Sequence, residues 1–199
     1  MEEVEERSRV LHAASIVIDG LNISRWDDRT FLHLRQGGVT AVNATLSVVD
    51  NFRTTISTIA EWHRRFDQYS DRIMPVKTVA DIKKAKELGK VGIIFGFQNI
   101  SPIEDDLDLL SVFKELGVRI IQLTYNERNF VGDGCLERTD SGLSNFGVEV
   151  VREMNRLGIL IDLSHVGYKT TMEAIGVSEK PVAFTHIGPR ALYDHPRNK

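Results

Sequence analysis

Short apolar runs alternate along the chain with longer stretches in which apolar and charged residues recur at helical spacing. The runs are near-continuously apolar, so they predict strands buried on both faces rather than strands with one face in water. Six such runs occur, at residues 15–18, 39–46, 91–97, 118–123, 159–161 and 181–184. Strands buried on both faces are typical of parallel sheets, and most of these runs are therefore predicted to form one.

The stretches between the apolar runs carry apolar residues three and four positions apart, which predicts amphipathic helices. The predicted helices cover residues 30–35, 54–66, 79–88, 106–116, 145–157 and 170–175. Three of them end in Leu-Gly just before an apolar run, at Gly89, Gly117 and Gly158. Glycine readily adopts the left-handed conformation that ends a helix, so these pairs predict repeated helix-to-strand connections. Ser144 is expected to cap the helix at 145–157.

Strands that alternate with helices imply right-handed crossovers and a parallel sheet. Such a sheet is either open and doubly wound or closed into a barrel, and the alternation alone leaves both open. No G-x-G-x-x-G follows the first run and no G-x-x-x-x-G-K-[ST] occurs in the chain. These absences argue against an oxidoreductase or nucleotide-binding protein on a doubly wound sheet.

Composition narrows the function classes. The chain has 199 residues, 42% hydrophobic and 27% charged, which fits one domain over residues 1–199. A net charge of −3 without a basic stripe argues against a nucleic-acid partner. The single cysteine, Cys135, excludes a disulfide within the chain and favours a reducing compartment. Neither a signal peptide nor a membrane span is recognisable, so we expect no membrane segment and a cytoplasmic protein.

Polar residues follow the predicted strands, where β/α folds place their active sites. They are Asp19, Gln98, Tyr125 with Asn126, Asp162 with His165, and Thr185 with His186. Two histidines at the ends of adjacent predicted strands suit a zinc site, which also requires a third ligand and an open position. Each histidine could instead bond a backbone group, and the pattern alone leaves both interpretations open.

Two histidine-bearing segments, 159–165 and 181–186, resemble the histidine motifs of the membrane (renal) dipeptidases, and the spacing between them fits. Segments with the order and spacing of that family are 17–22, 37–41, 91–98, 107–125 and 190–198. The resemblance implies an α/β fold of the (β/α)8 TIM-barrel type, here truncated to about six β/α units in a single incomplete domain. It also implies a metallohydrolase that cleaves dipeptides with two zinc ions and often dimerises.

The resemblance assigns roles to particular residues. His165 and His186 would ligate one zinc ion, and Arg197 would hold the substrate carboxylate, with Asn126 as a second substrate-binding residue. Tyr125 stands where the family has a histidine that stabilises the oxyanion, and its hydroxyl could donate the same hydrogen bond.

The family's other ligand positions are replaced. Leu21 and Ile23 stand where a His-x-Asp pair ligates the second zinc, and Gln98 stands for the bridging glutamate. Apolar side chains cannot ligate a metal, and an amide is a weaker ligand than a carboxylate. The expected cofactor is therefore one zinc ion or none, with Gln98 as a doubtful third ligand.

Two functions follow from this set. The first is a metal-dependent hydrolase that cleaves the amide bond of dipeptides or similar small carboxylated amides through a metal-activated water. The alternative is a non-hydrolytic pseudoenzyme or small-ligand binding protein on the same scaffold, because Leu21, Ile23 and Gln98 replace metal ligands. The expected partners are a dipeptide or other small molecule and, by resemblance, a second copy in a homodimer.

Overall fold

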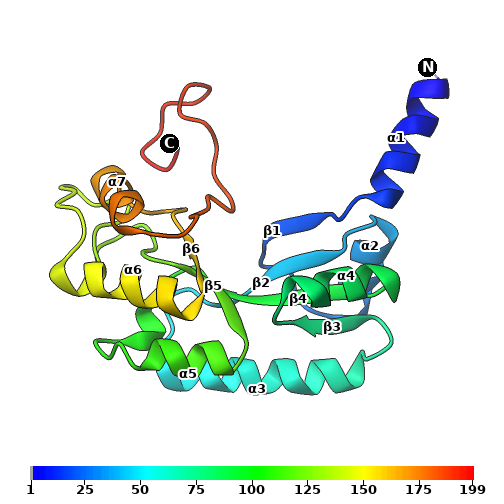
Figure 1. The fold of residues 1–199 in the computed structure, drawn as a ribbon, viewed down its shortest axis with the longest axis horizontal. Coiled ribbons are helices and arrows are strands. Elements are labelled where there is room, and N and C mark those ends of the chain that lie inside the picture. The colour runs from blue at the N-terminus through cyan, green and yellow to red at the C-terminus, as the bar shows by residue number, and fades with distance from the viewer. Residues whose placement is uncertain (1) are drawn as a thin grey trace. The chain divides into compact units, whose positions relative to one another are not determined.

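The computed structural model describes residues 2–199, in which helices alternate with parallel strands (Figure 1). The strands are β1 (Ile18–Asn22), β2 (Ala41–Ser47), β3 (Ile73–Val76), β4 (Val91–Phe97), β5 (Val118–Gln122) and β6 (Leu160–Asp162). The helices are α1 (Glu2–Ala14), α2 (Asp28–Gln36), α3 (Phe52–Gln68), α4 (Val79–Glu87), α5 (Leu109–Glu115), α6 (Asn145–Leu157) and α7 (Tyr168–Val177), with a 3-10 turn at Ser101–Ile103. No helix among these residues is both long enough and apolar enough to cross a membrane.

The strands form one sheet in the order β1-β2-β4-β5-β6, and β3 also pairs with β4. Strand β4 has three partners, because it pairs with β2, β3 and β5. Residues 91–94 pair with β3, and the pairing with β5 begins at Phe95 opposite Val118. All seven residues of β4 are buried, as its continuous apolar sequence predicts for a central parallel strand.

The chain divides into two compact units. One comprises the residues up to Ala44 together with Trp62–Ile94, and the other comprises Thr45–Glu61 together with Phe95–Lys199. The prediction of a single incomplete barrel domain over residues 1–199 stays a prediction.

Each unit has its own aromatic core. In the first unit, Trp26 packs against Trp62 with ring centroids 5.1 Å apart, and Phe31 packs against Tyr69 at the same centroid distance. In the second unit, Phe113 packs edge-on against Phe97 at 5.0 Å. The three helices α5, α6 and α7 lie side by side in that unit, with α5 against β5 and α6 against β6 (Figure 1).

The predicted helix ends are confirmed. Gly89, Gly117 and Gly158 all have positive φ angles, of 62°, 108° and 65°. Ser144 caps α6 by accepting a hydrogen bond from the backbone N–H of Gly147 at 2.9 Å. These local signals therefore place the connections between helices and strands correctly.

Two of the predicted strand positions are wrong, and one strand of the structure was not predicted. The first strand begins at Ile18 instead of residue 15, because its pairing with β2 starts there. Strand β3 was not predicted, since it has only four residues and contains Pro75, which is rare inside strands. The run at 181–184 forms no strand and joins the sheet only through a bridge between Ala183 and Asp162.

Candidate active site

His165 lies in the turn that follows β6, and His186 lies just beyond the bridge at Ala183. Their ring centroids are 5.0 Å apart, and the Tyr125 ring stacks on His165 at 4.3 Å. The structure therefore brings together three of the residues that sequence reasoning selected, although they come from three separate connections.

Backbone strain is concentrated at the same place. Glu104, Asn126 and His165 are the non-glycine residues with positive φ in the described chain, at 53°, 64° and 61°. Asn126 and His165 contact each other directly. Such conformations cost free energy and are enriched at functional sites, because the surrounding structure must hold them in place.

Hydrogen bonds define the tautomer of His165. Its Nδ1 lies 2.7 Å from the amide oxygen Oδ1 of Asn126. An amide oxygen can only accept, so Nδ1 of His165 carries the proton and donates it. Nε2 of His165 therefore bears a lone pair.

The same reasoning applies to His186, whose Nδ1 lies 2.7 Å from the hydroxyl oxygen of Thr185. That hydroxyl donates its only proton to Oδ2 of Asp162 at 2.6 Å, so it must accept from His186. The remaining ring atom, Nε2 of His186, is buried and has no hydrogen-bond partner.

Both imidazoles are neutral near pH 7. Burial lowers the pKa of His165 to about 3, with smaller effects from the charge of Arg197 and from the neighbouring His186 as it becomes protonated in acid. Burial also lowers the pKa of His186, and Asp162 opposes that shift. Neutral imidazoles with unprotonated Nε2 atoms are the form in which histidine ligates metals.

Arg197 borders the histidine pair. One of its terminal nitrogens, Nη2, donates to the backbone oxygen of His186, and the other, Nη1, is buried without a partner. Burial lowers the pKa of Arg197, but a guanidinium remains charged in proteins. A buried donor without a partner beside the imidazoles is a ready site for an anionic oxygen atom.

Comparison with known proteins identifies the family. The membrane dipeptidase family (Peptidase family M19) matches residues 6–198. The chain belongs to this family. Dipeptidase verJ of Clonostachys rogersoniana is 30% identical over 151 residues, which are 75% of this chain and 39% of that protein. An uncharacterized dipeptidase of Schizosaccharomyces pombe is 34% identical over 151 residues, 73% of this chain and 36% of its own.

Solved structures share the fold of this chain. The crystal structure of an amidohydrolase from Pseudomonas aeruginosa matches with a TM-score of 0.94 and 52% identity, covering 96% of this chain and 58% of that one. A metallopeptidase from Rhodobacter sphaeroides, liganded with a phosphinate mimic of L-Ala-D-Ala, shares the fold with a TM-score of 0.82 at 19% identity. The predicted α/β fold class, with helices alternating with the strands of a parallel sheet as in barrel hydrolases, is confirmed. The chain spans about two-fifths or less of the length of these curated dipeptidases.

The resemblance predicts that Gln98, Leu21 and Ile23 stand at ligand positions of the dipeptidase family. Gln98 follows β4, is 5% exposed and donates through Nε2 to the Thr45 hydroxyl at 3.0 Å. In the other unit, Ile23 is 72% exposed just beyond β1, and the backbone N–H of Leu21 bonds the carboxylate of Asp19. Within residues 2–199, no group of three or more His, Cys, Asp and Glu side chains is arranged to hold a metal ion. The predicted roles of His165, His186, Gln98, Tyr125, Asn126 and Arg197 stay predictions.

Sequence reasoning noticed Asp162 and Thr185 at strand ends but gave them no role. The structure makes them the support of His186: the Asp162 side chain is 2% exposed and accepts from the Thr185 hydroxyl and from the N–H groups of Ser164 and Thr185. Thr185 directly precedes His186 and Asp162 lies three residues before His165, and this closeness in sequence was the available signal.

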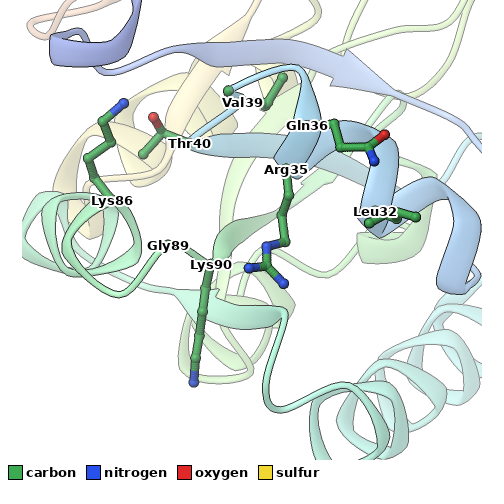
Figure 2. A pocket seen from close by; sticks show the side chains of 9 residues that line it. Leu32, Arg35, Gln36, Val39, Thr40, Lys86, Gly89 and Lys90 are labelled. Atoms are coloured by element: carbon green, nitrogen blue, oxygen red, sulfur yellow. The ribbon is translucent and has the colours of Figure 1, made fainter.

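The first unit has a hollow of about 450 Å³ at the amino ends of β2 and β4, and none of the candidate site residues lines it (Figure 2). Its basic residues are Arg35, Lys86 and Lys90. Arg35 and Lys86 stand in the last turns of α2 and α4, where cations favour the helix dipole. Figure 2 shows the two lysine side chains pointing in different directions, so the three charges do not converge on one ligand.

Proposed function

We propose that the chain carries the substrate-binding and metal-binding part of a hydrolase that cleaves small amides with a free carboxylate, such as dipeptides. The observation that carries the proposal is the pair of neutral imidazoles with Nδ1 fixed as donor and Nε2 left for coordination. Imidazole nitrogen is a preferred ligand of zinc.

The donor set fits one metal ion and not two. His165 and His186 would hold the ion, and Gln98 is the proposed third ligand, because its Nε2 is engaged by Thr45 and its Oε1 remains for coordination. Leu21 and Ile23 offer no donor atom for a second ion. A zinc ion held there would supply a Lewis acid and would lower the pKa of a water molecule, so that the water could act as a nucleophile near neutral pH.

The other residues act on the substrate. Arg197 would bind the carboxylate through Nη1, which orients the amide bond relative to the histidines. Tyr125, stacked on His165, would donate from its hydroxyl to the oxygen that becomes negatively charged during hydrolysis.

The test combines metal analysis with activity. We expect about one zinc ion per chain after purification with zinc, slow turnover of dipeptides, and loss of both in His186→Ala. His63→Ala is the matched control, because His63 is exposed on α3, and it should retain metal and turnover. A wild-type chain that binds no zinc and hydrolyses no dipeptide would overturn the proposal.

The replaced ligands Leu21, Ile23 and Gln98 favour a second candidate, a non-hydrolytic protein that binds a small carboxylated ligand. In that case dipeptides raise the melting temperature without zinc and without turnover. Arg197→Met would abolish this shift, whereas His186→Ala would not.

A further inference from the structure

The two imidazoles are held by different acceptors that enforce the same tautomer. A neutral imidazole can carry its proton on either nitrogen, and the hydrogen bond at one nitrogen decides the state of the other. Here the acceptor lies at Nδ1 in both rings, Oδ1 of Asn126 for His165 and Oγ1 of Thr185 for His186. Both Nε2 atoms are thereby left without protons.

The acceptor for His165 is fixed by the loop that follows β5. The backbone oxygen of Asn126 accepts from the N–H of Leu136 at 2.8 Å, and the backbone oxygen of His165 accepts from the N–H of Cys135 at 2.8 Å. Two consecutive loop residues, Cys135 and Leu136, thus bind the backbones of His165 and Asn126. Gly134 permits this approach, since a Cβ atom there would stand 2.1 Å from the carbonyl carbon of Asn126.

The acceptor for His186 is fixed by a buried carboxylate. Asp162 can only accept, and it takes the Thr185 hydroxyl proton at 2.6 Å. Nδ1 of His186 and Oδ2 of Asp162 are 3.8 Å apart, too far for a direct hydrogen bond, so the Thr185 hydroxyl connects them. Removing that hydroxyl would leave His186 with no acceptor at Nδ1.

From this geometry we infer that Asn126 and Thr185 are positioning residues that hold His165 and His186 in the Nδ1–H tautomer and so prepare both Nε2 atoms for one metal ion. The inference deepens the proposed function and rests on it for the identity of the bound group. It gives Asn126 a structural task beside the substrate contact expected from sequence, which stays a prediction.

Nitrogen NMR of the metal-free chain at pH 7.5 reads the tautomer of each ring directly. We expect Nδ1–H for both histidines in the wild type. Thr185→Val removes the hydroxyl at nearly constant shape and should move the proton of His186 to Nε2, while Thr185→Ser restores the wild-type spectrum. Asn126→Gly removes the amide acceptor at a residue type that tolerates the positive φ, and it should move the proton of His165 to Nε2. Asn126→Asp keeps an acceptor oxygen and should keep the proton of His165 on Nδ1.

Zinc affinity is the second readout, and we expect it to fall roughly 10- to 100-fold in Thr185→Val and Asn126→Gly. Thr171→Val is the matched control, since Thr171 has a buried hydroxyl without a partner and should leave both tautomers and zinc affinity as in wild type. Melting curves and the two conservative variants separate a tautomer change from unfolding.

The outcomes distinguish the two proposals. If Thr185→Val and Asn126→Gly keep the Nδ1–H tautomers, the positioning role is wrong even when zinc binds. If the tautomers change as expected but the wild type binds no zinc, the positioning role stands and the proposed metal site fails.

Discussion

The carboxylate of Asp133 anchors the loop between β5 and α6 from the inside. Its side chain is 2% exposed, pairs with the guanidinium of Arg128, and accepts from the backbone N–H of Ser141. Burial opposes ionisation, but the hydrogen bonds from Arg128 and Ser141 outweigh it and hold the pKa of Asp133 below its ordinary value. The ionised carboxylate of Asp133 therefore stabilises the loop that positions Asn126.

Asp133→Asn should destabilise the chain by about 1–3 kcal/mol at pH 7, because an amide pairs poorly with Arg128 and leaves a buried donor unsatisfied. Asp67→Asn, on the exposed face of α3, is the control and should change stability by less than about 0.5 kcal/mol. Urea unfolding of the three proteins measures the differences.

The pH dependence of the same comparison has a defined sign. The folded pKa of Asp133 is lower than the unfolded one, so its contribution is complete above the unfolded value near 3.8 and is lost as pH falls through the folded value. The gap between wild type and Asp133→Asn should therefore narrow under acid conditions. A gap that widens on acidification would contradict the assignment of Asp133 as an ionised anchor.

Helix α6 combines a capped start, an apolar face and a left-handed end. Ser144 closes its first turn, Val150, Val151 and Met154 are fully buried, and Gly158 ends it at φ 65°. The residues after Gly158 lead directly into β6 and to His165. The angle of this glycine thus contributes to the position of the histidine turn.

The same substitution at two glycines should have opposite effects. Gly158→Ala should cost about 1 kcal/mol, because an alanine in the left-handed region is strained even though only Lys114 Nζ lies near the added methyl. Gly176→Ala, inside α7 with open space around it and no positive φ, should stabilise by up to about 1 kcal/mol. Chemical unfolding gives both numbers, and equal signs would show that backbone conformation does not decide the result.

At the scale of the whole molecule, the sequence predicts the elements whose signals are local. Strand β4 and helix α6 are predicted to the residue, because a continuous apolar run and a capped amphipathic repeat each lie within one segment. The bridge at Ala183 depends on β6, and the connection from Asp162 through Thr185 to His186 joins separate segments. Local periodicity carries no information about pairings between distant segments. The roles of Asp162 and Thr185 were therefore not predicted, although the two histidines were.

Local stability should differ strongly between helix α1 and strand β4. Helix α1 exposes Val4, Val10 and Leu11, each at 60% or more, and a helix of its 13 residues is marginal without packing. Strand β4 is buried along its whole length. Hydrogen exchange should therefore show the amides of α1 exchanging within seconds to minutes, while those of β4 exchange only through global unfolding.

Helix α6 provides the control for this experiment, because it has the same length as α1 but a fully buried face, and its central amides should be protected. Protection is a property of packing here and not of helix length. If α1 proved as protected as α6 in the isolated chain, its apolar residues would have to be covered by a surface, and a dependence of that protection on protein concentration would identify the surface as a second copy of the chain.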